Sequence, residues 1–340
     1  MPASYLLMDG NSIGYINQHV GAMSNGEMAT HAIYGSLRMI GKLLAAHPGY
    51  TPLVVWDGRA QWRYELFPAY KSDRHKSESA RRSREEFELQ RPVLQKVLAN
   101  LGVAQLRHPD CEADDVAYVF ADHLAKKGRR VRCVSADSDW YAMLRETVDC
   151  LDPKSKGRGL VTMQNFSEVT GYHSVRAITE GKAIVGDSSD CLPGADKIGD
   201  KTAAELLRDY GSLQSLFEAI DKGRVDMKKV KFKNLAAARG QIELNLRLID
   251  LDAAPVPAGM VLWMKPFNED MFLSYCRKLR FDSLVRNPGW LVEQFRSSLD
   301  CADREELAIH IRNLDGVVCG QPKDKVAAGS RETEQLPVAA

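Results

Sequence analysis

The sequence predicts an α/β fold with a largely parallel sheet, followed by a helical region. Three short apolar runs, SYLLMD, PLVVWD and RRVRCV, have the length of strands, and segments with helical periodicity separate them. Alternating strands and helices are typical of a parallel sheet covered by helices. From about Gln164 onward the pattern is helical, so we expect the second part of the chain to consist of helices.

Composition sets limits on the class of protein. The 340 residues allow two domains, and a content of 44% hydrophobic and 27% charged residues is ordinary for a chain with a buried core. The net charge of +1 does not indicate a nucleic-acid partner, so local charge has to decide that question. The seven cysteines include no CxxC pair, which argues against a disulfide framework and a zinc site. We see no signal peptide or long apolar run, and expect a cytoplasmic protein without membrane contact.

Each predicted strand ends at acidic residues. Asp9 ends the first strand, Asp57 follows the second, and Asp137 and Asp139 follow the third. The carboxyl ends of parallel strands meet at one edge of the sheet, where the functional crevice of such folds lies. We therefore expect these acids to project toward one region.

A basic segment follows the second strand. Lysine and arginine outnumber acids over residues 59–84, and aromatic residues such as Tyr70 lie between them. This pattern is typical of an electrostatic funnel for single-stranded nucleic acid, with rings available for stacking; a solvated basic surface is the alternative. Lys71 and Arg74 are expected on one helix face, and either could stabilise charge near a scissile phosphate. A long helix over 83–101 follows, in which Pro92 marks a kink or a late start.

Two further acidic motifs follow. EADD places Glu112, Asp114 and Asp115 in the first turn of a predicted helix, and GDSSD places Asp187 and Asp190 close together. Helix capping or turn formation explains each acid taken alone. Gathered in one crevice, however, they would repel one another and raise each other's pKa, so a cation has to neutralise them.

The chemistry of these acids predicts a divalent metal site. Neither histidine nor cysteine accompanies them, and an oxygen-only ligand set suits Mg²⁺ or Mn²⁺. An acid-rich site can hold two ions and hydrolyse a phosphodiester by in-line displacement. The candidate ligands are Asp9, Asp57, Glu112, Asp114, Asp115, Asp137, Asp139, Asp187 and Asp190.

A glycine-containing turn, LPGADKIG, precedes a helix that begins near residues 200–202. Gly199 allows a phosphate to approach the backbone, the helix start offers free N–H groups, and Lys201 adds charge. Two helices joined by such a hairpin are a common device for gripping a DNA backbone without reading bases.

The motifs MDGNS, VWDG, YKSDR, EADD, SADSDW, GDSSDCLPG and IGDKTAAELL occur in this order between about Leu6 and Val285. Their combination resembles the structure-specific 5′-nuclease (flap endonuclease) family, which includes phage 5′→3′ exonucleases and the 5′-nuclease domain of bacterial repair DNA polymerases. The resemblance implies an α/β, PIN-like nuclease domain with a helical arch, and a helix-three-turn-helix (SAM-like) module. We expect the nuclease domain over 1–163 with the arch at about 60–100, the helix-hairpin module over 164–260, C-terminal helices packing back on the core over 261–318, and a disordered tail over 319–340.

The resemblance also implies roles for individual residues. One metal group would include Asp9, Asp57, Glu112 and Asp114, with Asp115 close to both ions, and the second would include Asp137, Asp139, Asp187 and Asp190. Two Mg²⁺ ions, replaceable by Mn²⁺, are the implied cofactors, and K⁺ is a candidate at the hairpin. Lys71 and Arg74 would act in the arch near the scissile phosphate. The implied DNA contacts are Tyr70, Arg81, Arg82, Arg84, Lys182, Lys197, Gly199, Lys201 and Thr202. At Lys197 the family commonly has glycine, so the chain departs from the pattern there.

We therefore expect a monomeric 5′→3′ exonuclease and flap endonuclease acting on DNA flaps, free 5′ ends, nicks and gaps in replication or repair. With no room for a polymerase domain, it is expected to act alone, in a bacterium or a phage-infected cell. The alternatives are a non-catalytic junction binder, an RNase H-like or PIN-type ribonuclease, and an aspartate-based phosphotransfer domain. The complete acidic set argues against the binder, and the hairpin with Asp187 and Asp190 argues against phosphotransfer. The pattern leaves RNA in the cleaved strand open.

Overall fold

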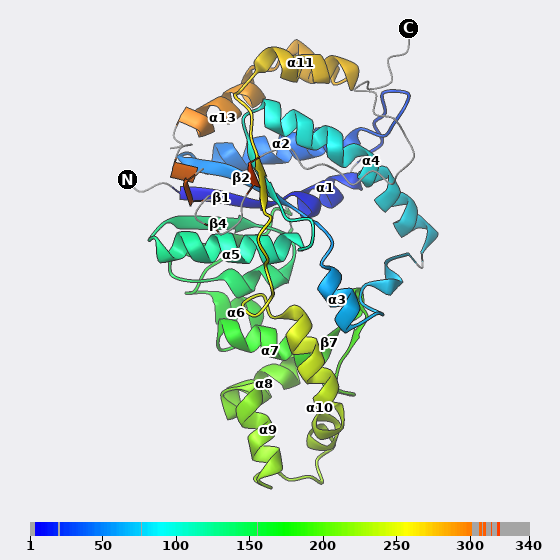
Figure 1. The fold of residues 1–340 in the computed structure, drawn as a ribbon, viewed down its shortest axis with the longest axis vertical. Helices are drawn as coiled ribbons and strands as arrows, with labels where there is room; N and C mark the ends of the chain where they lie inside the picture. The colour runs from blue at the N-terminus through cyan, green and yellow to red at the C-terminus, as the bar shows by residue number, and fades with distance from the viewer. Residues whose placement is uncertain are drawn as a thin grey trace.

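The computed structural model describes residues 4–19, 21–75, 77–154, 156–300, 306–307, 309–310, 314 and 318–319. The molecule is elongated, with a sheet and its covering helices in the upper part of Figure 1 and a helical lobe below. Of the expected tail, Cys319 lies in a short strand, and residues 320–340 lie outside the described residues.

Eight of the described strands form the main sheet, in the order β10-β9-β3-β2-β1-β4-β5-β6, and two short strands of the lower lobe form a separate pair. The strands of the main sheet are β1 (Ser4–Asp9), β2 (Tyr50–Trp56), β3 (Ala104–Arg107), β4 (Arg130–Val134), β5 (Val148–Leu151), β6 (Leu160–Val161), β9 (Val261–Trp263) and β10 (Val318–Cys319). The five neighbouring strands β3, β2, β1, β4 and β5 run parallel. At the two sides of this group, β9 pairs with β3 and β6 pairs with β5 in antiparallel fashion. The predicted, mostly parallel sheet is confirmed.

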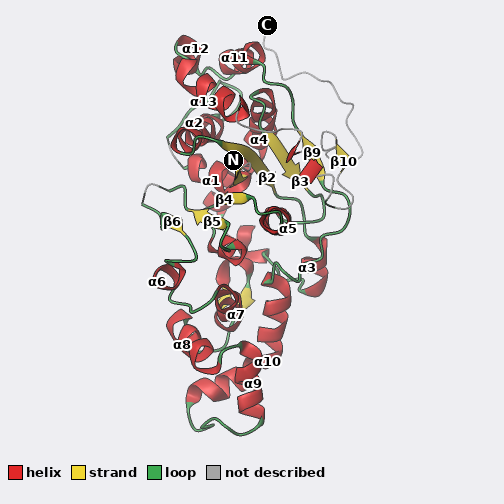
Figure 2. Cartoon of the chain, turned by 90° about the vertical axis from the view of Figure 1, so that its left-hand side faces the viewer, coloured by secondary structure: helices red, strands yellow, loops and turns green. Residues whose placement is uncertain are grey.

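Helices cover both faces of the sheet because side chains on buried strands alternate between two cores. Leu6 and Met8 of β1 face a core that includes residues from six helices: α1 (Gly10–Gln18), α2 (His31–Ala46), α4 (Glu78–Asn100), α11 (Glu269–Lys278), α12 (Asp282–Arg286) and α13 (Gly289–Asp300). Tyr5 and Leu7 face the opposite core, which α5 (Ala113–Lys126) covers. Figure 2 shows α5 below the sheet and α2, α12 and α13 above it.

The basic segment forms three pieces rather than one continuous arch helix. They are α3 (Gln61–Leu66), the 3₁₀ turn η1 (Ser72–His75) and α4. Helix α4 begins earlier than the predicted 83, because the Ser77 side chain accepts a hydrogen bond from Ala80 N and caps the helix there. Pro92 lies inside α4, so it marks no late start.

The lower lobe contains α6 (Phe166–Thr170), α7 (Val175–Val185), α8 (Asp200–Tyr210), α9 (Leu213–Asp221) and α10 (Val230–Ile249). Between α7 and α8 lie β7 (Gly186–Asp187), the 3₁₀ turn η3 (Ser188–Asp190) and β8 (Leu192–Pro193). The expectation of helix throughout from Gln164 is wrong at this hairpin, where Gly186 has a φ of 81° and ends α7, and at β9, which joins the main sheet. The core on the α5 side continues into α7, α8 and α10 and joins the two parts.

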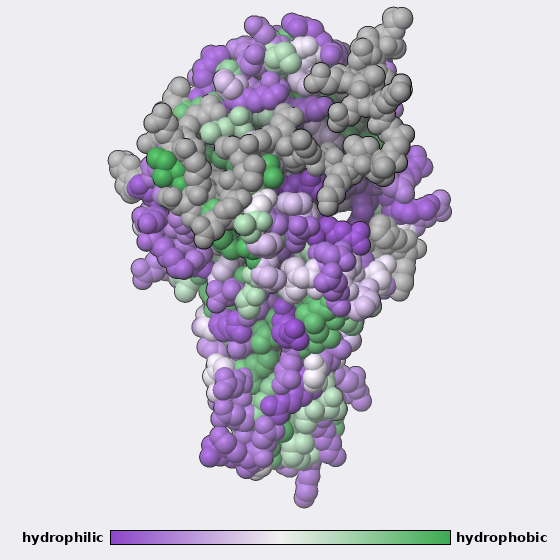
Figure 3. Space-filling model, in the orientation of Figure 1, coloured by the Kyte–Doolittle hydropathy of each residue, from purple (hydrophilic) through white to green (hydrophobic). Residues whose placement is uncertain are grey.

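The surface is mixed in character. On the face shown in Figure 3, hydrophilic residues dominate, and hydrophobic residues are visible along the junction and the lower lobe. Within the described ranges, no helix combines the length and the apolar character needed to cross a membrane.

Candidate active site

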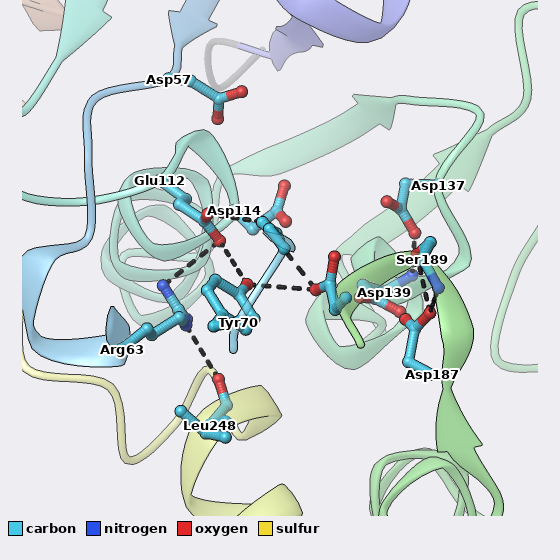
Figure 4. A network of polar contacts seen from close by, with 12 residues as sticks. Asp57, Arg63, Tyr70, Glu112, Asp114, Asp137, Asp139, Asp187, Ser189 and Leu248 are labelled. Carbon is cyan, nitrogen blue, oxygen red and sulfur yellow. Dashed lines mark hydrogen bonds and ion pairs between the residues drawn. The ribbon is translucent and has the colours of Figure 1, made fainter. Parts of the chain in front are cut away.

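The predicted acids come together because the elements that carry them are neighbours. Strands β2, β1 and β4 lie side by side, so the residues that follow their carboxyl ends share one edge of the sheet. The first turn of α5 and the β7–η3 hairpin complete the site (Figure 4). The acids line a cavity of about 1150 Å³, and those on its wall are Asp9, Asp57, Glu112, Asp114, Asp137, Asp139, Asp187 and Asp190.

The strand-end acids are held by bonds between neighbouring loops. Asp9 caps α1 by accepting a hydrogen bond from Ser12 N at 2.9 Å, and it accepts another from Ser135 Oγ at 2.8 Å. Asp57 accepts hydrogen bonds from Ala113 N at 2.8 Å and from the side-chain amide of Asn11. These bonds fix both carboxylates before any ligand binds, because the donors come from three segments: the start of α1, the start of α5 and the loop after β4.

Two lysines lie among the acids. The Lys182 ammonium group contacts Asp139 Oδ1 and lies 2.7 Å from Asp187 Oδ2. The Lys71 ammonium group contacts Glu112 Oε1 and lies 3.9 Å from Asp190 Oδ2. Each lysine therefore joins an acid of the nuclease sheet region to an acid of the β7–η3 hairpin. Lys182, expected at DNA, lines the acidic cavity.

Acidity in the cavity follows from burial and from these charges. Burial, followed by repulsion from Asp57, raises the pKa of Asp9 to about 7. Burial and repulsion from Asp137 raise the pKa of Asp139 to about 6, although Lys182 opposes the shift. Burial also acts to raise the pKa of Asp187, but Lys182 and Ser189 outweigh it and lower this pKa to about 2. The lysines thus neutralise only part of the negative charge.

Asp114 occupies the centre of the acid group. Burial raises its pKa well above the ordinary value, and repulsion from Asp137, Asp9, Asp57 and Glu112 adds to the shift. These neighbours belong to both predicted metal groups. Like Asp9, which Asp57 and Asp137 both affect, Asp114 therefore has electrostatic neighbours in both groups.

The donor chemistry fits a hard divalent cation. The cavity offers carboxylate oxygens without histidine or cysteine, and repulsion among these carboxylates adds to burial in raising the pKa values of Asp9 and Asp114. In the part of the chain that the structure describes, no three His, Cys, Asp or Glu side chains form a group that could hold an ion as they stand. Mg²⁺ commonly binds through one or two carboxylates and keeps several water ligands, so the separate carboxylates of the cavity fit its chemistry.

Asp115 lies apart from the cavity, which corrects the expectation that it is close to both ions. Its carboxylate is wholly buried and accepts two hydrogen bonds from the Arg63 guanidinium at 2.6 and 2.7 Å. It also accepts one from Glu112 N at 3.0 Å. Asp115 is turned inward because it closes the capping box of α5. Its position supports Glu112 rather than an ion.

Arg63 ties three parts of the chain together. Besides Asp115, its guanidinium lies 3.4 Å from Glu112 Oε2, and its Nε donates to the carbonyl of Leu248 at 2.9 Å (Figure 4). Leu248 lies in the last turn of α10, where carbonyls lack partners within the helix. The base of the arch, the acids of α5 and the lower lobe therefore meet at one buried cation.

Tyr70 is not available for base stacking, contrary to expectation. Its residue is 3% exposed, and its hydroxyl lies 3.0 Å from Glu112 Oε2 and 3.1 Å from Asp190 Oδ2. Burial and these two carboxylates raise the pKa of Tyr70, so the hydroxyl remains a hydrogen-bond donor to the acids.

Lys71 and Arg74 do not share a helix face as expected. Lys71 has a φ of 56°, in the left-handed region, and its N–H donates to the carbonyl of Asp190 at 3.1 Å. Arg74 lies three residues later, in η1, and its side chain is outside the described part. Helix α3 has already ended at Leu66, and the Lys71 side chain lines the cavity.

The remaining arch arginines differ from one another. Arg81 and Arg82 are exposed and lie near Glu85 and Glu86, at 3.9 and 3.3 Å. Arg84 lines the cavity, and its Nε is a buried atom without a hydrogen-bond partner among the described residues. Of the three, Arg84 is the one placed at the site.

The loop before α8, expected to contact a phosphate through its backbone, contains a residue in the left-handed conformation. Lys197 has a φ of 57°, which explains physically why glycine would suit this position. Gly199 is the N-cap of α8, and Lys201 and Thr202 lie in its first turn. Asn234 of α10 donates to the carbonyl of Asp196 at 2.7 Å and braces the loop.

The fold and the cavity together define an α/β protein whose sheet and helical lobe share an acidic, oxygen-rich site. A family model for the "5′-3′ exonuclease, N-terminal resolvase-like domain" matches residues 4–171, and one for the "5′-3′ exonuclease, C-terminal SAM fold" matches residues 174–262. The two cover most of the chain, which therefore belongs to the 5′-3′ exonuclease family. The family and the SAM-like fold of the second region are confirmed.

Relatives agree with this assignment. The chain is 30% identical over 290 residues to the thermostable DNA polymerase I of Thermus thermophilus, covering 84% of this chain and 33% of the polymerase. It is also 30% identical over 271 residues to DNA polymerase I of Mycobacterium bovis, covering 78% of this chain and 29% of that protein. The chain thus spans about a third of the length of these relatives.

Solved structures share the fold. The bacteriophage T5 flap endonuclease, in a complex with DNA and metal ions, has a TM-score of 0.62 and 19% identity, over 88% of this chain and 100% of that one. Flap endonuclease-1 from Methanococcus jannaschii has a TM-score of 0.58 and 16% identity, over 88% and 94%.

Several residues of the site were not found by sequence reasoning. Asn11, Ser135, Trp140 and Arg63 hold carboxylates in place, and none was assigned such a role. The motifs MDGNS and SADSDW contain three of them, so position within an acidic motif was the available signal. Arg63 gave no such signal, because in the sequence it looks like any other cation of the basic segment, whereas in the structure it is buried against Asp115.

Proposed function

We propose that this chain is a divalent-metal-dependent 5′→3′ exonuclease and flap endonuclease that hydrolyses DNA phosphodiesters near junctions of single and double strands. The observation that carries the proposal is that acids from both matched domains line the same cavity. An oxygen-rich site of this kind suits phosphodiester hydrolysis better than redox or acyl-transfer chemistry.

The two predicted groups of acids would hold two ions, Mg²⁺ or Mn²⁺. The first is Asp9, Asp57, Glu112 and Asp114, and the second is Asp137, Asp139, Asp187 and Asp190. The chemistry that such ions supply when bound is activation of a water molecule and stabilisation of the departing oxygen. The chain's own part is to fix the acids through hydrogen bonds from neighbouring loops, and to keep Lys71 and Lys182 beside them as cations for a phosphate.

The proposed substrates are DNA flaps, free 5′ ends, nicks and gaps. Related folds have been solved with DNA: the T5 enzyme in a product complex, the Rad2 catalytic core with a DNA substrate, and human GEN1 with a Holliday junction. In this chain we assign the duplex backbone to Lys197, Gly199, Lys201 and Thr202, with K⁺ as a candidate ion there. We assign the single strand to the arch, through Arg74, Arg81, Arg82 and Arg84.

A 5′-labelled flap duplex tests the proposal. We expect wild type to release short 5′ products with Mg²⁺ but not with a chelator, and Asp187→Asn to lose about 100-fold or more in single-turnover rate. Asp122→Asn is the control: Asp122 lies on α5 outside the cavity and pairs with Arg145, so this change should leave the rate unchanged. Binding of the flap without cleavage in Mg²⁺ or Mn²⁺ would replace the nuclease by the junction binder.

A further inference from the structure

A tryptophan donates a hydrogen bond to the central acid of the cavity. Trp140 Nε1 lies 2.6 Å from Asp114 Oδ1, and the Trp140 residue is 1% exposed. A bond from a neutral donor to a carboxylate at this distance is of the strong, charge-assisted kind. The proposed chemistry gives this indole no role, although the indole donates to Asp114, which is a proposed metal ligand.

The bond joins two different parts of the site. Trp140 belongs to the 3₁₀ turn η2 (Ser138–Met143) and directly follows Asp139 of the second metal group. Asp114 lies in the first turn of α5 and belongs to the first group. This hydrogen bond therefore links the two elements that carry the groups, which also pack together in one core.

An indole suits this task for physical reasons. It donates a hydrogen bond but cannot accept one, so it always presents the same polarity to the carboxylate. Its rigid ring sits in the core below the cavity, where Cys150 Sγ lies 3.2 Å from the Trp140 carbonyl oxygen. With Oδ1 held by the ring, the plane of the Asp114 carboxylate is set, and Oδ2 is the oxygen that the indole does not engage.

We propose that Trp140 is a positioning residue for divalent-ion binding, acting by fixing the orientation of the acid that lies between the two metal groups. The inference rests on the proposed function, since it concerns the same site. Partners behind metal-ligating side chains commonly contribute a factor of about 10–100 to metal affinity.

Trp140→Phe removes the N–H while keeping an aromatic ring, and Trp56→Phe is its matched control. Trp56 is also 1% exposed and donates to a side-chain oxygen, Gln105 Oε1 at 2.9 Å, in the core on the other face of the sheet. Titration calorimetry with Mn²⁺ alone, without DNA, should show about 10–100-fold weaker binding in Trp140→Phe. Trp56→Phe should bind within about twofold of wild type. Equal affinity in all three proteins, or an equal loss in both variants, overturns the inference.

A second measurement uses wild type and does not depend on how the variants fold. The ¹⁵N–¹H indole resonance of Trp140 should shift when Mg²⁺ is added, whereas that of Trp56 should not. An unshifted Trp140 resonance in a protein that binds Mg²⁺ overturns the inference and leaves the nuclease proposal standing. Wild type that binds no divalent ion overturns both.

Discussion

The Arg63 guanidinium is almost wholly buried and serves carboxylates and a carbonyl at once. Its side chain is 3% exposed, and that of Asp115 is 0% exposed. Replacing a complete buried ion pair by neutral groups often costs little, whereas removing one partner leaves an uncompensated charge and costs about 3–5 kcal/mol. The main energetic role of Arg63 is therefore to compensate the buried charge of Asp115, which would be unpaired without it.

Arg63→Gln is expected to lower the free energy of unfolding by about 3–5 kcal/mol, because Asp115 stays buried without its cation. The double variant Arg63→Gln/Asp115→Asn should recover much of this loss, because it removes both charges. Arg132→Gln is the comparison: its bidentate partner Asp149 is more exposed, so the loss should be about 1 kcal/mol. Equilibrium urea unfolding measures all three, and a double variant as unstable as Arg63→Gln alone would contradict this account.

At the residue scale, chemical type was predictable and burial was not. The acids could be identified as candidate site residues because they follow apolar runs or occur in pairs. Tyr70 and Lys71 look like ordinary members of a basic, aromatic surface segment, and their contacts with Glu112 depend on how the chain folds back. Side-chain direction of this kind is a tertiary property, so a local pattern could not predict it.

At the scale of elements, the loop before α8 carries a local strain. Lys197 occupies the left-handed region, which residues other than glycine, asparagine and aspartate seldom adopt. The left-handed conformation costs roughly 1–2 kcal/mol for a residue with a Cβ. Lysine at this position thus lowers the stability of the fold and places a positive charge beside the start of α8.

Lys197→Gly should raise the free energy of unfolding by about 0.5–1 kcal/mol, because relief of strain exceeds the entropy that glycine adds to the unfolded chain. Lys197→Ala keeps the strained backbone and should give no such gain. Both variants should bind duplex DNA more weakly, with a slope of log affinity against log salt that is smaller by about one. Stability comes from urea unfolding and affinity from fluorescence anisotropy. A gain in Lys197→Ala equal to that in Lys197→Gly would show that strain is not the cause.

The elements differed in how well the sequence predicted them. Strands β1, β2 and β4 are apolar runs in the centre of the sheet and were expected. Strands β3, β5, β6 and β9 are two to four residues long, too short for a period to emerge, and pairing with neighbours defines them. The start of α4 was misplaced because its first turns are polar, so Ser77 was the only signal there.

At the scale of the whole molecule, the buried acids make stability depend on pH. Asp9 has a pKa of about 7 and Asp139 of about 6 in the folded chain, against an ordinary value of 3.8. Between about pH 4 and 7 the folded protein therefore binds more protons than the unfolded one, so stability falls as pH rises through this window. Asp187, with a pKa lowered to about 2, has the opposite sign and loses its contribution only below about pH 4.

In chelator, the unfolding temperature is therefore expected to fall between about pH 5 and 7.5, and excess Mg²⁺ should raise it most at the upper end, where the acids are ionised. Asp9→Asn should flatten the profile in chelator, because it removes one of the titrating groups. Differential scanning calorimetry at several pH values measures the effect. A wild-type profile in chelator no steeper than that of Asp9→Asn would contradict the assignment.

Helix α10 touches the hairpin near one end and Arg63 at the other. Asn234 bonds to Asp196, Asn245 bonds to the carbonyls of Ala183 and Pro193, and Leu248 accepts from Arg63. The stretch from Asn234 to Leu248 is about 20 Å of rigid rod at 1.5 Å per residue. In the proposed nuclease, the length of this helix would set the distance between the loop that binds the duplex backbone and the acids that cleave the strand. The position of cleavage would then depend on that distance and not on the base sequence.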